Sequence, residues 1–117
     1  MAYNENIADR IRNSFAALSN VEEKKMMGGI AFMYNGKMCV GVIKDDLMCR
    51  IDPNIFEDLI KLKGCKPMDF TKRPMKGYIY VDESGMETDK QFNFWIDKAL
   101  EFNPLAKASK KKKKKEL

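Results

Sequence analysis

Histidine is absent from the chain of 117 residues. Its absence removes the usual general base, the usual partner of a nucleophilic cysteine or serine, and the commonest zinc ligand. A Ser–His–Asp or Cys–His site within one chain is therefore excluded. We expect a protein that is not an enzyme, with no catalytic residues, no cofactor and no metal ion.

Cysteine and the phosphate-binding glycine motifs are also scarce or missing. The three cysteines, Cys39, Cys49 and Cys65, are an odd number without a C-x-x-C pair. This spacing favours free thiols in a reducing compartment over a disulfide framework or a zinc site. The glycines fit neither G-x-G-x-x-G nor G-x-x-x-x-G-K-[ST], so they indicate turns and bulges instead of a phosphate-binding loop.

Long apolar runs are missing too. No stretch approaches the roughly 20 apolar residues that cross a bilayer, and the N-terminal MAYNENIADR lacks the basic-then-apolar pattern of a secretion signal. We therefore expect a soluble cytoplasmic protein with no membrane partner.

The net charge of +5 is unevenly distributed. Residues 1–106 hold 15 Lys and Arg against 16 Asp and Glu, so the excess positive charge belongs to the C-terminal segment. We predict one folded domain over residues 1–104 and a disordered lysine-rich tail over residues 105–117. The tail offers a weak, non-specific nucleic-acid contact through its six consecutive lysines, Lys110, Lys111, Lys112, Lys113, Lys114 and Lys115, or it only improves solubility.

A strand meander is predicted over residues 26–51, because Asn35-Gly36 lies between two apolar runs. Asn-Gly favours a two-residue hairpin turn, since both turn residues must take a positive φ. The strands on either side, residues 30–34 and 37–43, should then pair. This register sets Met33 opposite Met38, Ala31 opposite Val40, and Phe32 opposite Cys39.

A second turn at Asp45-Asp46 should bring residues 47–51 back beside the same strand, with Val42 opposite Cys49 and Val40 opposite Ile51. Because side chains alternate along a strand, each register divides the residues between two faces. The predicted core face carries Ala31, Met33, Met38, Val40, Val42, Leu47, Cys49 and Ile51. The other face, which we expect to be partly open, carries Ile30, Phe32, Tyr34, Cys39, Gly41, Met48 and Arg50.

Three amphipathic helices are predicted to cover the core face. The first spans residues 4–18 with Asn4 as its N-cap, and the second spans residues 53–63 with Asp52 as its N-cap. The third follows a capping box formed by Thr88 and Gln91 and ends near Phe102. Further strands are expected at residues 21–27 and 77–81, and a long loop at residues 65–76.

The open face and the long loop hold the candidate site residues. Met48 and Met75 are expected to face a partner, because methionine side chains adapt to varied surfaces. Arg50, Asp69, Arg73 and Lys76 form a polar cluster if the loop folds over this face. The cluster has two interpretations. It is either a structural ion pair or a site for an anion or another ligand. The full candidate surface is Phe32, Met48, Arg50, Asp69, Arg73, Met75 and Lys76.

Several of these segments together resemble the N-terminal domain of the TfoX/Sxy family, over about residues 3–103. The resemblance rests on VEEKKMMGGIAFMYNGKMCVGV, on DLMCRI, on PMDF followed by RPMKGYIYV, and on a final helix carrying Trp95. It implies a small α+β domain, a two-layer sandwich in which about three helices cover one face of an antiparallel sheet of four to five strands. Full-length family members are described as regulators of bacterial competence genes and carry a second helical domain, whereas this chain ends in a lysine tail.

We therefore predict a non-enzymatic regulatory or protein-interaction module that uses the open sheet face and the adjoining loop. Its expected partner is another protein or a second copy of the chain. The alternatives are a nucleic-acid-associated protein that binds through its lysine tail, and a small-ligand-binding domain.

Overall fold

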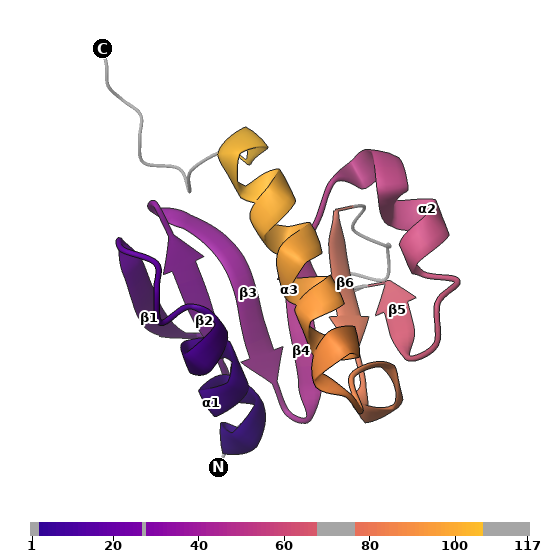
Figure 1. The fold of residues 1–117 in the computed structure, drawn as a ribbon, viewed down its shortest axis with the longest axis horizontal. Coiled ribbons are helices and arrows are strands. Elements are labelled where there is room, and N and C mark those ends of the chain that lie inside the picture. The colour runs from indigo at the N-terminus through magenta and orange to yellow at the C-terminus, as the bar shows by residue number, and fades with distance from the viewer. Residues whose placement is uncertain (1–2, 27, 68–76, 107–117) are drawn as a thin grey trace.

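The computed structural model describes residues 3–26, 28–67 and 77–106. Figure 1 shows one antiparallel sheet with α1 and α3 lying over the same face, and α2 beside the end of the sheet that carries β5 and β6. The predicted α+β class is confirmed. The sheet has six strands in the order β1-β2-β3-β4-β6-β5, which is one or two more than predicted.

The elements of the described residues follow one another closely along the chain. The helices are α1 (Glu5–Ser14), α2 (Phe56–Leu59) and α3 (Asp89–Phe102), with short 3-10 turns η1 (Pro53–Ile55), η2 (Glu83–Gly85) and η3 (Asn103–Leu105). The strands are β1 (Val21–Met26), β2 (Gly29–Tyr34), β3 (Lys37–Ile43), β4 (Asp46–Arg50), β5 (Cys65–Pro67) and β6 (Tyr78–Val81).

The Asn35-Gly36 turn is confirmed, but the register beyond it is only partly as predicted. Both turn residues have positive φ, and Met33 pairs with Met38. The register then shifts, so that Phe32 pairs with Val40 and not with Cys39. Cys39 is therefore an extra residue in β3, the pattern of a β-bulge.

The second turn lies one residue earlier than predicted, at Lys44-Asp45, because Ile43 pairs with Asp46. Lys44 takes a positive φ of 54°, which the tight turn requires. The predicted partners of β4 are therefore wrong by two residues. Val42 pairs with Leu47, and Val40 pairs with Cys49.

The bulge reverses the predicted faces of β2. Ile30 and Phe32, predicted on the open face, belong to the core cluster that packs under the helices, as does Cys39. Ala31 and Met33, predicted in that core, are buried but lie outside the cluster. The predictions for β3 and β4 hold better, since a shift of two residues preserves the face: Val40, Val42, Leu47 and Cys49 all join the core.

The opposite side of the sheet, called the second face here, carries one row of residues that runs across all six strands. The row is Lys24, Ala31, Gly41, Met48, Tyr80 and Lys66, each paired with the next. A Cβ on Gly41 would lie 2.9 Å from Cε of Met48, so the methionine side chain covers the glycine.

The predicted helix caps are confirmed, although two helices are shorter than predicted. The Asn4 side chain accepts from the N–H of Asn6, the Asp52 side chain from that of Asn54, and Thr88 and Gln91 form the capping box. α1 ends at Ser14 and α2 at Leu59, where turns with i to i−3 hydrogen bonds replace the helix. α3 ends at Phe102 as predicted.

Two boundaries differ from the prediction. β5 lies in the segment predicted as a loop, where three residues pair with β6. Leu105 and Ala106, predicted in the tail, are part of the described structure, and Ala106 is buried. Over the described ranges, no helix is long and apolar enough to cross a membrane.

Candidate functional site

The candidate residues of the sheet do not lie together on one face in the structure. Phe32 lies in the core at 1% exposure, in edge-to-face contact with Phe15, so its prediction as an exposed contact is wrong. Met48 does lie on the second face, but it is also 1% exposed. Neither side chain is available to a partner in this conformation.

Arg50 is placed at the end of β4 beside two aromatic rings. Its guanidinium carbon lies 5.6 Å from the ring centroid of Tyr78 and 6.0 Å from that of Phe102. Burial raises the pKa of the Cys39 thiol, and the positive charge of Arg50 partly opposes this rise. Arg50 therefore links β4, β6 and the last turn of α3.

The other candidate residues lie outside the described ranges. They are Asp69, Arg73, Met75 and Lys76 in the loop, and Lys110, Lys111, Lys112, Lys113, Lys114 and Lys115 in the tail. The predicted polar cluster and the predicted tail contact thus remain predictions.

The three thiols are free and buried. Burial raises the pKa of Cys39 and that of Cys65 to about 12, and raises the pKa of Cys49 well above its usual range. Cys39 and Cys49 were predicted to point to opposite faces, but both belong to the core cluster. Since the thiolate is the nucleophilic form, all three are poorly suited to covalent chemistry at neutral pH.

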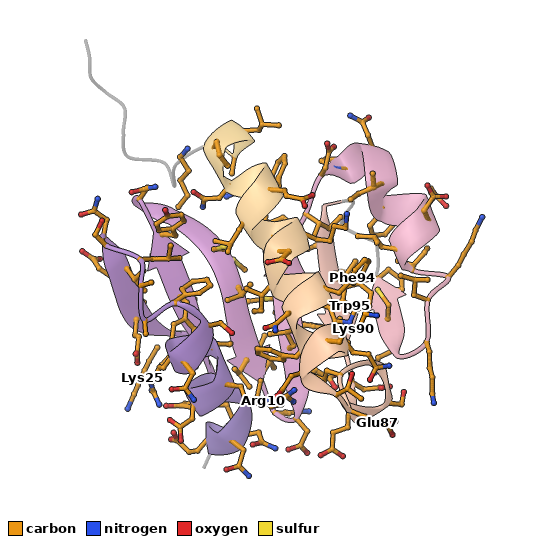
Figure 2. All side chains as sticks on the ribbon, viewed as in Figure 1. Arg10, Lys25, Glu87, Lys90, Phe94 and Trp95 are labelled. Atoms are coloured by element: carbon orange, nitrogen blue, oxygen red, sulfur yellow. The ribbon has the colours of Figure 1, made fainter. Side chains whose placement is uncertain are left out.

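A hollow of about 350 Å³ opens between the turn that follows α2 and the first half of α3. We call it the α2–α3 hollow. Figure 2 shows Lys90, Phe94 and Trp95 on the side of α3 that faces α2 and β5. The hollow is lined by Leu62, Lys63, Gly85, Lys90, Gln91, Phe94 and Trp95.

Two glycines allow the walls of this hollow to approach each other. A Cβ on Gly64 would lie 2.5 Å from the backbone nitrogen of Gly85, and a Cβ on Gly85 would lie 2.5 Å from the carbonyl oxygen of Lys63. The carbonyl of Gly64 also accepts a hydrogen bond of 2.9 Å from the N–H of Asp82. The turn after α2 is thereby fixed against η2, which precedes α3.

Trp95 forms a rigid part of the lining. Its indole Nε1 donates a hydrogen bond of 2.9 Å to the carbonyl oxygen of Gly85, and the side chain is buried. The neighbouring Phe94 ring packs edge-to-face against it, with 5.0 Å between ring centroids. Because Phe94 is 37% exposed, this pair connects the core to the surface.

The charged residues that line the hollow are lysines. Lys63 and Lys90 belong to the lining, and Nζ of Lys98 lies 5.3 Å from the ring centroid of Phe94. None of the lining residues is an aspartate or a glutamate. The hollow therefore combines an apolar wall with a positive rim.

A second hollow, of about 400 Å³, lies between α1 and η2 and is more polar. Arg10, one of its lining residues, already makes contacts within the fold. Its Nη1 donates to the carbonyl oxygen of Met86 at 3.0 Å, and its guanidinium carbon lies 4.2 Å from the Phe92 ring centroid. Among the described residues, no three His, Cys, Asp or Glu side chains gather where they could hold a metal ion.

The sequence does not indicate the α2–α3 hollow. Phe94 lies outside the buried apolar stripe of α3, which consists of Phe92, Trp95, Ile96 and Ala99. Leu62 falls near the end of a predicted helix. An apolar side chain off the stripe is the pattern that would have identified Phe94. Nothing in the sequence indicates that Leu62 and Phe94 line one hollow.

The architecture defines the class of the protein, a small α+β domain whose helices pack on one face of an antiparallel sheet. The family model of the TfoX N-terminal domain matches residues 13–103. The chain belongs to this family, as the resemblance indicated. Searches against curated proteins and against solved structures gave no match.

Proposed function

We propose that the protein is a non-enzymatic regulatory module that acts by binding another protein. Membership of the TfoX N-terminal domain family supports a regulatory role related to that of the competence regulators. The lack of histidine and the raised pKa values of the buried thiols support a role in binding and not in catalysis.

The exposed apolar wall of the α2–α3 hollow is the observation that carries this proposal. Leu62 is 43% exposed and Phe94 is 37% exposed, and both line the same hollow. Exposed apolar surface with a polar rim is a feature of interaction sites. The docking surface proposed here is therefore this hollow, in place of the sheet face favoured by the sequence.

Affinity capture from the cells that contain the protein tests the proposal. The wild-type chain, Phe94→Ala and Leu105→Ala are immobilised in parallel and the bound proteins are compared. Leu105 is the matched control, because it is 70% exposed and is not part of the lining. We expect a partner that binds the wild type and Leu105→Ala but is lost with Phe94→Ala.

Reconstitution of that complex from two purified proteins completes the test. Light scattering on the free chain covers the case in which the partner is a second copy. A strictly monomeric chain with no partner that depends on Phe94 would contradict the proposal.

The lysine run supports a second candidate function, non-specific association with nucleic acid. Seven lysines lie between residues 107 and 115, while residues 1–106 are nearly neutral. Binding through such a segment releases counterions and weakens steeply with salt. We expect duplex DNA binding to disappear on deletion of residues 107–117, and binding that survives the deletion would refute this version.

A further inference from the structure

We infer that the α2–α3 hollow binds a short acidic segment of a partner protein, in which an apolar side chain enters the hollow and a neighbouring carboxylate pairs with the lysines at its rim. The inference rests on the proposed function and specifies the chemistry of the partner. It follows from the size, the lining and the charge of the hollow.

The size of the hollow favours a short segment over a folded surface. Its volume of about 350 Å³ lies at the lower end of the range of roughly 300–1,000 Å³ typical of ligand pockets. Such a hollow accommodates one or two side chains. A partner would therefore present a few consecutive residues to it.

The lining selects an apolar side chain. Leu62 forms one wall and the Phe94–Trp95 pair forms the other, and Gly85 also lines the hollow. The hydrogen bond from Trp95 to Gly85 fixes the indole before any ligand arrives. A preorganised aromatic wall loses little conformational entropy on binding, which favours affinity.

The rim selects a negative charge beside that side chain. Lys63 and Lys90 lie on the rim, and Nζ of Lys98 lies 5.3 Å from the ring centroid of Phe94. Lys98 is also 3.6 Å from Glu101, so we assign the carboxylate to the other two lysines. With no acidic residue in the lining, an arriving carboxylate meets no like charge there.

A nucleic acid is the less favoured occupant of this site. Single strands bind along extended basic grooves in which successive bases stack on aromatic rings. Here one aromatic ring, Phe94, is substantially exposed, and Leu62 forms the opposite wall. The hollow thus suits an inserted side chain better than a stacked base.

Selection of short random peptides displayed on phage against the full chain tests the inference. We expect enrichment of peptides in which an aromatic or aliphatic residue adjoins aspartate or glutamate. The enriched peptides are then synthesised together with an amide version, in which glutamine and asparagine replace the acids, and a version in which alanine replaces the apolar residue.

Fluorescence of Trp95, the only tryptophan of the chain, reports binding in the hollow itself. We expect the acidic peptide to give a saturable change in Trp95 fluorescence. The amide version should bind about fivefold more weakly, because it loses a partly exposed ion pair. The alanine version should give no saturable change. Lys90→Glu should weaken the acidic peptide by at least about fivefold through charge reversal. Lys24→Glu, the same charge change on exposed β1, should leave its affinity unchanged.

Several outcomes would overturn the inference. These are enrichment of peptides without acids, no enrichment, equal affinity of the acidic and amide versions, an unchanged affinity in Lys90→Glu, or competition by oligothymidylate for the same Trp95 signal. A captured cellular partner that requires Phe94 but binds Lys90→Glu normally would also overturn the inference while leaving the proposed function intact. If acidic peptides bind but no cellular partner requires Phe94, the proposed function fails and the assigned chemistry of the hollow stands.

Discussion

The indole nitrogen of Trp95 donates a hydrogen bond of 2.9 Å to the carbonyl oxygen of Gly85, across a buried contact between α3 and η2. The same Gly85 leaves no space for a Cβ against the turn that follows α2. These two contacts hold α3, η2 and the end of α2 in one arrangement. Both walls of the α2–α3 hollow depend on it.

Trp95→Phe should destabilise the fold by about 1–3 kcal/mol, because the buried carbonyl of Gly85 loses its donor. Urea unfolding followed by far-ultraviolet circular dichroism measures the change. Phe94→Ala is the control and should cost less, since that ring is partly exposed. Equal costs for the two variants would show that the hydrogen bond contributes little.

Gly85→Ala should destabilise the protein by at least about 1–3 kcal/mol, because its Cβ would lie 2.5 Å from the backbone oxygen of Lys63. Gly36→Ala is the matched comparison. Gly36 has a positive φ of 79° but open space around it, so alanine there meets only the backbone penalty of about 1–2 kcal/mol. Thermal unfolding of both variants measures the difference, and a Gly85→Ala protein as stable as wild type would contradict the close approach.

The ion pair between Arg12 on α1 and Glu23 on β1 should make a contribution to the free energy of unfolding that depends on pH. Nε and Nη2 of Arg12 donate to the two carboxylate oxygens, each at 2.9 Å, and this lowers the pKa of Glu23. Because the folded pKa is depressed, the stabilisation is present above the unfolded pKa of about 4.3 and is lost as pH falls through the folded pKa.

Glu23→Gln should therefore lower the free energy of unfolding by less than about 1 kcal/mol at neutral pH, because both side chains of the pair are more than a third exposed and are screened by solvent. The difference from wild type should shrink in acid and at high salt. Glu22→Gln, on the opposite face of the same strand, removes an equal charge and serves as the control. A difference that persists at low pH would refute this assignment.

Because the three thiols are buried, we expect them to react slowly with alkylating agents and the protein to lose stability at alkaline pH. Burial raises the pKa of Cys39 and Cys65 to about 12, above the unfolded value of about 8.5. A raised folded pKa means that their contribution to stability is complete below about pH 8.5 and is lost as pH rises toward 12.

Iodoacetamide should accordingly label the native protein slowly near neutral pH and label all three cysteines quickly in urea. Cys39→Ala should reduce the loss of stability on going above about pH 8.5, relative to wild type. Rapid labelling of the native chain would show that the thiols are reached through local opening.

Local sequence patterns predicted the parts of the fold that depend on neighbouring residues. The Asn35-Gly36 turn, the Asn4 and Asp52 caps and the Thr88–Gln91 capping box were all found where expected. Each is decided within a few residues, by the φ angle that a turn requires or by one side chain that accepts from a nearby N–H.

The tertiary structure corrected what depends on pairing between distant segments. The extra residue at Cys39 moved Phe32 to the core face and Ala31 to the second face, since a shift of one residue reverses the side on which a strand residue lies. β5 is a strand only because it pairs with β6, and its sequence, with Pro67 at its end, gave no strand pattern.

The sequence by itself determined the family, the α+β class, the helix caps and the lack of histidine. Only the tertiary structure decided which residues could meet a partner: it buried Phe32 and Met48 and brought Leu62 together with Phe94. The physical reason is that turns and caps are short-range, whereas a surface hollow depends on how separate elements pack. The close contact of Gly64 with Gly85 is what brings the two walls of this hollow together.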